Sequence, residues 1–493
     1  MRFNKKVIGL LLGPIAFILI LNFFHPQDLS NEANAILASV VWMIIWWVSE
    51  ALPIPVTAML PLVLFPLSGG LNLPDTAAAY GHKFIFLFLG GFILAIAIEK
   101  WNLHKRIALS IIYMVGTSVM NIILGFMLAT AFLSMWISNT ATSVMMLPIG
   151  LAIVTQLKDN PDTIEDENQI FGKALMLAIG YSATIGGIGT LIGTPPNLVL
   201  AGVFNEIFNI EITFSQWIVF GLPISLSLLF ICWYYLTRFG FSFKQKEFPG
   251  GRKEIKRQLD ALGKLSFEEK VVATVFICTA LAWISRSFLL KQLLPGIDDT
   301  IIAIASAIIL FILPTNEKGR KLLNWEEAAR LPWGILILFG GGMAIAAGFG
   351  GSGLAQWIGS QMVLLKDVPL LVLVFLLVLF VNLITEVTSN MALTAMILPI
   401  LAPLALVMGV HPYLLMVGAT AASSCAFMLP ISTPPNAVVF GSGYLTIPDM
   451  VKTGFWLNII SVVLIVFMVF FVLPYLWDFD ATVFPEALKQ KIK

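Results

Sequence analysis

The chain has 493 residues, of which 58% are hydrophobic and 12% charged, and its net charge is +1. A soluble domain carries about 25% charged residues, so this composition excludes a chain that faces water throughout and indicates one that faces lipid. The small net charge also argues against a nucleic acid as partner. The cysteines Cys232, Cys278 and Cys425 lie in apolar runs without metal-ligand spacing, and we interpret them as small buried residues.

Apolar runs predict an all-α polytopic membrane protein of about 11 transmembrane helices, since a helix needs roughly 20 apolar residues to span a bilayer. The runs are continuous and not alternating, which favours helices over barrel strands. The first run follows Lys5 and Lys6 and lacks a small-residue cleavage site, so we interpret it as a retained helix and not as a signal peptide. In chain order, the predicted spans are 7–24, 35–50, 54–69, 83–100, 172–203, 215–237, 270–290, 299–314, 333–349, 412–440 and 455–475.

Two further apolar stretches, about 118–155 and about 368–408, are too long for one span and too short for two spans with a loop. Each has polar residues at its middle, Ser138-Asn139-Thr140 in the first and Ser389-Asn390 in the second. We expect both to be re-entrant hairpins, because irregular backbone is tolerated at membrane depth where it lines a cavity within the protein.

Basic residues predict the orientation, because loops rich in Lys and Arg stay in the cytoplasm. The loops 25–34, 205–214 and 292–299 contain neither residue. The basic groups fall on the other side of the predicted membrane: Lys5-Lys6, His104-Lys105-Arg106, the segment 238–269 and Lys318-Arg320-Lys321. We therefore expect a protein of the cell inner membrane with its N-terminus in the cytoplasm and its C-terminus outside, and an amphipathic helix on the membrane surface within 238–269.

The sequence repeats. Gly90-Gly91 matches Gly341-Gly342, and Ser138-Asn139 matches Ser389-Asn390, both at an offset of 251 residues. Thr-Pro-Pro-Asn recurs at an offset of 239, shorter by 12 because of an acidic insert at about 157–170; the full copies are Gly193-Thr194-Pro195-Pro196-Asn197 and Ser432-Thr433-Pro434-Pro435-Asn436. Five predicted spans separate the Ser-Asn motifs, and an odd number inverts the second copy. Inverted repeats are typical of secondary transporters.

These observations predict five segments. They are an N-terminal helix and loop (1–34), a first inverted repeat (35–237, with a broken helix at 172–203), a basic cytoplasmic linker (238–269), a second inverted repeat (270–475, with a broken helix at 412–440) and a C-terminal tail (476–493).

The Thr-Pro-Pro-Asn motif breaks a helix, because proline removes a backbone donor and clashes with the preceding turn. Freed carbonyls can coordinate a cation, helix N-termini attract anions, and Ser and Asn side chains serve either ligand. The alternative is that the prolines are kinks and that Ser and Asn join helices; two paired motifs at matched positions favour a binding site. No basic residue adjoins the motifs in sequence, so cations would supply the positive charge that an anion needs. Glu386 fits two interpretations, a functional acid and a residue that orients the hairpin.

With these motifs, and with the stretch 86–106, the sequence resembles the divalent anion/sodium symporter family over roughly residues 35–475. The resemblance implies a scaffold domain and an elevator-type transport domain, a homodimer, and Na⁺-coupled uptake of C4-dicarboxylates such as succinate, malate and fumarate. The family's second motif is usually Ser-Asn-Thr, whereas Met391 stands third here. Because a thioether donates no hydrogen bond, substrate preference at that carboxylate stays open.

The resemblance also implies site residues. A first Na⁺ site would use Ser138, Asn139 and the backbone at Gly193, and a second would use Thr385, Thr388, Asn390 and Ser432. The substrate carboxylates would meet Asn139, Thr140, Thr194, Ser389, Asn390 and Thr433.

Other functions are possible alternatives at this point. Within the transporters, the alternative is a cation-independent dicarboxylate exchanger or a sulfate or citrate carrier of the same fold. An enzyme is disfavoured, because no nucleophile with a base and no metal cluster is visible at membrane depth. An ion channel is disfavoured because alternating access explains the paired hairpins better.

Overall fold

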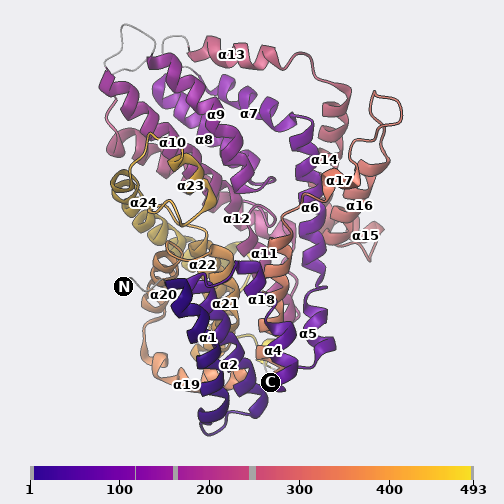
Figure 1. Cartoon of the computed structure of the whole chain (residues 1–493), viewed down its shortest axis with the longest axis vertical. Coiled ribbons are helices and arrows are strands. Elements are labelled where there is room, and N and C mark those ends of the chain that lie inside the picture. The colour runs from indigo at the N-terminus through magenta and orange to yellow at the C-terminus, as the bar shows by residue number, and fades with distance from the viewer. Residues whose placement is uncertain (1–4, 117, 159–164, 244–250, 490–493) are drawn as a thin grey trace.

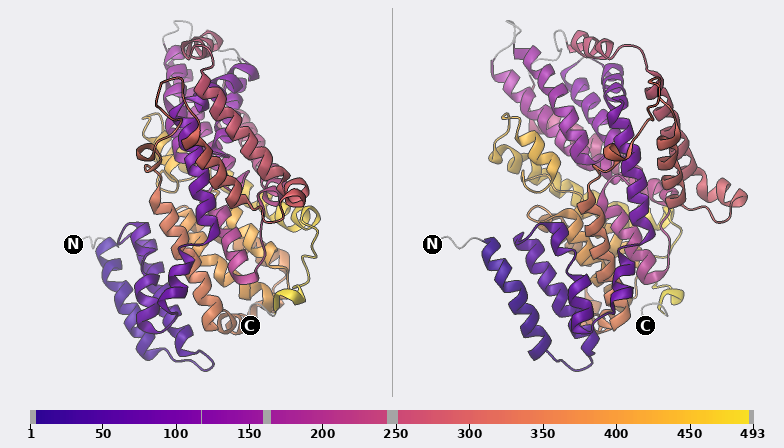
Figure 2. Two further views of the ribbon diagram at one scale, coloured as in Figure 1. Left: turned by 90° about the vertical axis from the view of Figure 1, so that its right-hand side faces the viewer. Right: turned by 45° about the vertical axis from the view of Figure 1, so that its right-hand side comes forward.

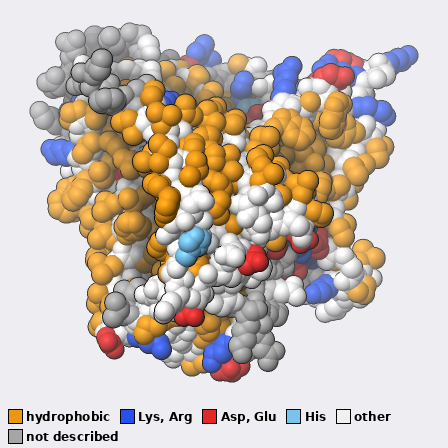
Figure 3. All heavy atoms as spheres, turned by 60° about the horizontal axis from the view of Figure 1, so that its bottom comes forward, with side chains coloured by type: hydrophobic (Ala, Val, Ile, Leu, Met, Phe, Trp, Pro, Cys, Tyr) orange, Lys and Arg blue, Asp and Glu red, His pale blue; other side chains and the backbone are white. Residues whose placement is uncertain are grey.

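The computed structural model of the protein describes residues 5–116, 118–158, 165–243 and 251–489. Most of these residues are helical, and their only β pairing is an isolated bridge between Pro314 and Lys321. Nine helices of the described part are long and apolar enough to cross a membrane. Hydrophobic side chains cover much of the face shown in Figure 3, and charged side chains gather mostly toward its upper and lower edges. The protein is therefore a multi-pass helical membrane protein.

The N-terminal helices gather at one end of the molecule, and α6 leads from them toward the opposite end (Figures 1 and 2). The segment predicted as a single span at 54–69 is two short helices, because Pro61 starts a new one. The helices are α1 (Lys5–Phe23), α2 (Asn31–Ser49), α3 (Ile54–Thr57), α4 (Pro61–Ser68), α5 (Leu73–Ala79) and α6 (Lys83–Lys100).

The next helices carry the first Ser-Asn motif and the first Thr-Pro-Pro-Asn break. Asn102, at a φ of 55°, separates α6 from α7, a helix that the sequence did not indicate as a separate element. The elements are α7 (Leu103–Val115), α8 (Val119–Ser134), α9 (Asn139–Lys158), α10 (Glu165–Ile188), α11 (Pro195–Phe208), α12 (Phe214–Tyr235), which η1 (Leu236–Gly240) continues, and α13 (Gly251–Ala261).

The remaining helices carry the second copies of both motifs. They are α14 (Phe267–Ser285), η2 (Arg286–Leu290), α15 (Lys291–Leu293), α16 (Asp299–Ile312), α17 (Trp325–Ala328), α18 (Trp333–Ser352), α19 (Leu354–Gln361), η3 (Val363–Asp367), α20 (Leu370–Ile384), α21 (Asn390–Met408), α22 (Pro412–Ser423), α23 (Pro434–Phe440), α24 (Ile447–Phe467), η4 (Met468–Val472), α25 (Leu473–Leu476) and α26 (Glu486–Lys489).

Each apolar stretch that was predicted to be a hairpin is a pair of helices joined by a short turn. Residues 135–138 join α8 to α9, and residues 385–389 join α20 to α21. By length and composition α21 could cross a membrane by itself, so the re-entrant depth of this hairpin stays a prediction. Parts of the acidic insert, of the basic linker and of the C-terminal tail lie outside the described residues.

The two halves of the chain pack crosswise. Helix α11, which follows the first Thr-Pro-Pro-Asn break, packs against α21, which follows the second Ser-Asn motif. Helix α23, which follows the second break, packs against α9 and α10 of the first half. Each broken helix thus lies beside the hairpin of the other half, which brings the four motifs into one region.

Candidate functional site

The first Ser-Asn motif lies where the turn between α8 and α9 meets the break in α10. Ser134, at the end of α8, places its hydroxyl oxygen 2.6 Å from Asn139 Oδ1 and 2.6 Å from the carbonyl oxygen of Ala183. Ser138 turns the chain, and its hydroxyl accepts a hydrogen bond from the Ala141 amide at 3.2 Å. The side-chain oxygens of Ser134 and Asn139 and the carbonyl oxygen of Ala183, which belong to α8, α9 and α10, therefore converge at the start of α9.

The second Ser-Asn motif has the same arrangement at matched positions. The Thr385 hydroxyl oxygen lies 2.7 Å from Asn390 Oδ1 and 2.7 Å from the carbonyl oxygen of Ser423. Thr385 follows Ser134, and Asn390 follows Asn139, at the offset of 251 that the sequence repeat has. The repeat thus extends from the sequence to individual hydrogen bonds.

Each hydroxyl has one proton but faces two acceptor oxygens at hydrogen-bond distance. A single proton can bond only one of the two at a time, so the hydroxyl cannot donate to both oxygens of its cluster. A cation removes the conflict, because hydroxyl, amide and carbonyl oxygens can all coordinate it at the same time. Such neutral oxygen sets next to unwound helices suit a hard monovalent cation.

The asparagine of each Thr-Pro-Pro-Asn motif holds the unwound segment before it. Asn197 Nδ2 donates to the carbonyl oxygen of Thr190 at 2.8 Å. Asn436 Nδ2 donates to the carbonyl oxygens of Ala426 and Leu429, both at 3.1 Å. Among the described residues the Oδ1 atoms of both asparagines are buried without a hydrogen-bond partner. These side chains give the two breaks their shape.

The threonines of the two breaks stand at helix N-termini. Thr194 and Thr433 are the N-cap residues of α11 and α23, and each side chain is 4% exposed. The Thr433 hydroxyl accepts a hydrogen bond from the Asn436 amide, whereas Thr194 makes no such bond. Pro195 and Pro196 have no N–H, and the Asn197 amide bonds the carbonyl oxygen of Thr194 at 3.2 Å, so the start of α11 attracts a carboxylate through the helix dipole and not through free backbone donors.

Glu386 orients the second break. This carboxylate is 2% exposed and accepts hydrogen bonds from the backbone amides of Phe427, Met428 and Leu429 at 2.7, 2.9 and 3.1 Å. Asn458 Nδ2 donates a fourth at 2.7 Å. Four donors saturate the carboxylate, so the structure favours the orienting interpretation of Glu386 over that of a functional acid.

The structure brings some of the predicted residues together and leaves others apart. The Gly193 carbonyl oxygen and Asn139 Oδ1 both lie close to Gly187. A Cβ atom added to Gly187 would be 3.1 Å from the first oxygen and 2.7 Å from the second, so Gly193 is beside the first cluster. Ser432 lies in the second break and contacts Asn436 Nδ2 at 3.0 Å. The Thr388 hydroxyl donates to the carbonyl of Ile384 at 3.0 Å, and its oxygen keeps its lone pairs.

The third residues of the two Ser-Asn motifs differ in their surroundings. Thr140 is exposed, whereas Met391 is 5% exposed and packs within the hydrophobic core. The motif copies are therefore unequal in position as well as in chemistry.

Sequence reasoning missed Ser134 and Gly187. Ser134 stands 251 residues before Thr385, so the repeat offset could have found it. Gly187 lies in an apolar, glycine-rich run, and only the packing against Asn139 reveals its role.

Residues 4–477 match the family described as the sodium:sulfate symporter transmembrane region. The chain belongs to this family. It is 50% identical over 481 residues to the sodium-dependent dicarboxylate transporter SdcS of Staphylococcus aureus strain bovine RF122 / ET3-1, covering 96% of this chain and 92% of the relative. SdcS of strain USA300 matches to the same extent.

Two solved structures share the fold. Neisseria gonorrhoeae MtrF aligns with a TM-score of 0.59 at 13% identity, covering 97% of this chain and 96% of MtrF. The YdaH transporter of Alcanivorax borkumensis aligns with a TM-score of 0.52 at 12% identity, covering 94% of this chain and 96% of YdaH. Family and fold together make this protein a membrane transporter and not an enzyme.

Proposed function

We propose that the protein is a symporter that couples the uptake of C4-dicarboxylates, such as succinate, malate and fumarate, to Na⁺. The observation that carries the proposal is the duplicated oxygen cluster, in which one hydroxyl faces an asparagine amide oxygen and a backbone carbonyl at the end of each hairpin's first arm. The 50% identity to a sodium-dependent dicarboxylate transporter supports the choice of ion and substrate.

Each cluster is proposed to hold one Na⁺. The first site comprises Ser134, Ser138, Asn139 and the backbone at Gly193. The second comprises Thr385, Asn390, Ser432 and Thr388, the last through its backbone or its side chain. Ser134 joins the expected residues because it occupies the position of Thr385 and contacts Asn139 in the same way.

The dicarboxylate is proposed to lie between the two clusters, one carboxylate toward each. The crosswise packing of α11 on α21 and of α23 on α9 supports a single site, because it brings each broken helix beside the hairpin of the other half. The residues assigned to the substrate are Asn139, Thr140, Thr194, Ser389, Asn390 and Thr433.

Coupling to Na⁺ follows from electrostatics. Moving a dianion into a cell against about 100 mV costs roughly 4.6 kcal/mol, at about 2.3 kcal/mol per charge. Two Na⁺ cancel this cost, and a third would make uptake electrogenic. The neutral side chains of the clusters agree with this scheme, since they offer the anion no fixed positive charge.

The larger architecture is part of the same proposal. The two halves form inverted repeats, and a transport domain with both hairpins and both broken helices moves as an elevator against a scaffold domain. Two copies form a homodimer in the cell inner membrane, with the N-terminus in the cytoplasm and the C-terminus outside. The matched hydrogen bonds of Ser134 and Thr385 support the repeat.

Uptake of labelled succinate into proteoliposomes tests the function. An inward Na⁺ gradient should drive accumulation, and equal rates in Na⁺ and choline would reject the symport. Unlabelled malate and fumarate should compete, whereas sulfate and citrate should not. Competition by sulfate or citrate alone would instead support the alternative carrier, which Met391 in place of the usual threonine leaves open.

A further inference from the structure

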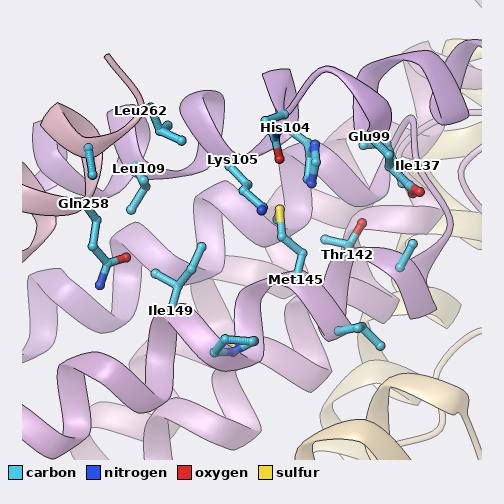
Figure 4. Close-up of a pocket in the computed structure, with 15 residues that line it drawn as sticks. Glu99, His104, Lys105, Leu109, Ile137, Thr142, Met145, Ile149, Gln258 and Leu262 are labelled. Atoms are coloured by element: carbon cyan, nitrogen blue, oxygen red, sulfur yellow. The ribbon is translucent and has the colours of Figure 1, made fainter.

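A groove of about 620 Å³ opens on the side of the first hairpin, between α9 and the elements α6, α7 and α13 (Figure 4). It adjoins the Ser-Asn motif, because its lining includes Ile137, Ala141 and Thr142 on either side of Asn139. It is not part of the proposed site, because none of the residues assigned to Na⁺ or to the substrate lines it. No role for the groove follows from the transport site described above.

Two unpaired polar groups face this groove. Thr142 is 1% exposed, and its hydroxyl has no hydrogen-bond partner among the described residues. Lys105, at the start of α7, has no carboxylate within ion-pair distance in the described part of the chain, and in Figure 4 its side chain extends into the groove beside Met145. A free ammonium group and a free hydroxyl on opposite walls form a pair of donors that suits one anionic group.

The other polar residues of the groove leave this pair available. His104 Nδ1 lies 3.1 Å from the carbonyl oxygen of Ile98, which holds its ring in place. Glu99 lies near Ile137, with His104 between it and Lys105 in Figure 4, so its carboxylate is away from the ammonium group. Gln258 of α13 adds an amide at the end of the groove beyond Lys105.

Most of the groove is apolar. Its walls include Leu109 of α7, Met145 and Ile149 of α9, and Leu262 after α13. Val144 also lines it and is 53% exposed, so the groove opens to the surroundings of the protein. A C4-dicarboxylate has two charged ends and would meet only one free cation here, whereas an amphiphile with one anionic head and a hydrocarbon chain matches both parts.

We propose that this groove binds an anionic membrane lipid, with its phosphate at Lys105 and Thr142 and an acyl chain along Leu109, Met145 and Ile149. The neighbouring surface supports a lipid as the source of the anion. Helix α13 exposes Lys253 and Lys256, while Arg257 beside them pairs with Glu254; basic amphipathic segments of this kind concentrate anionic lipids at a membrane surface.

The site has a consequence for transport. One wall is α9, which begins at Asn139, and the other walls are α6, α7 and α13. A lipid in the groove therefore contacts both the hairpin and the helices packed beside it, and it stabilises this packing. This consequence rests on the proposed function, whereas lipid binding itself does not.

The test is native mass spectrometry of the purified full chain in detergent with added phosphatidylglycerol or phosphatidylcholine. The wild type should retain phosphatidylglycerol in preference to phosphatidylcholine. The double variant Lys105→Gln, Thr142→Val should retain phosphatidylglycerol about tenfold less, because a hydrogen-bonded charge contact is lost. The control variant Lys291→Gln removes one lysine charge from α15, outside the groove, and should retain the lipid as the wild type does.

Two results would overturn the proposal: equal retention of both lipids by the wild type, or unchanged phosphatidylglycerol retention in the double variant. Succinate uptake in phosphatidylcholine vesicles with and without phosphatidylglycerol then separates this claim from the proposed function. A wild type that retains the lipid but transports no succinate would leave the lipid site intact and reject only the transport assignment.

Discussion

Replacing Ser134 by alanine removes one oxygen from the first cluster and leaves the fold around it in place. Ser134 is buried at the end of α8, and its hydroxyl oxygen lies 2.6 Å from both Asn139 Oδ1 and the Ala183 carbonyl oxygen. Without cation, the single proton satisfies one of the two acceptors. With Na⁺ bound, the hydroxyl oxygen becomes a ligand that the alanine methyl group cannot replace.

The expected loss is about 2 kcal/mol of Na⁺ binding, within the range for a buried polar group that loses its partner, and corresponds to about a thirtyfold higher half-saturating Na⁺ concentration. Succinate uptake into proteoliposomes, measured against Na⁺ concentration, gives this value. Ser134→Thr should restore it, because threonine occupies the matched position at Thr385. Thr130→Val is the control, since the Thr130 hydroxyl, also buried, bonds the Phe126 carbonyl one turn earlier in α8 at 2.6 Å. An unchanged Na⁺ dependence in Ser134→Ala would refute the assignment of this cluster to a cation.

Three further predictions concern the neighbouring residues. Asn139→Ala and Asn390→Ala should each abolish uptake while membrane insertion stays normal, and wild-type rates in both would reject the site. Gly187→Ala should lower uptake at least tenfold, because its Cβ atom would come within 2.7 Å of Asn139 Oδ1 and displace the amide; an unaltered rate and Na⁺ dependence would mean that the amide can move without loss. Met391→Thr should raise succinate affinity or broaden the range of substrates, and an identical concentration dependence and substrate profile would mean that this position does not contact the ligand.

Local signals predicted the helical class and the positions of the motifs. Apolar runs specify helices because lipid leaves the backbone no other partners, and a Pro-Pro pair interrupts a helix wherever it stands. The breaks before Pro195 and Pro434 therefore appear in the structure where the sequence placed them. The repeat offset, 251 at the Ser-Asn motifs and 239 at the breaks, relates each motif in one half to its copy in the other.

Contacts between distant segments could not be predicted in this way. The role of Glu386 depends on three backbone amides more than 40 residues further along the chain, and nothing in its local sequence specifies them. Lys105 stands far from the Ser-Asn motif in sequence, but it shares a groove with Thr142. Likewise, the exposure of Thr140 and the burial of Met391 follow from different packing around two similar motifs.

The central claim is that the two Ser-Asn clusters bind the ions that move with the substrate, and the flux of labelled sodium tests it most directly. In proteoliposomes with equal Na⁺ on both sides, an inward gradient of succinate should draw labelled sodium inward. Asn139→Ala and Asn390→Ala should each abolish this flux. Succinate entry by the wild type without any movement of labelled sodium would contradict the account.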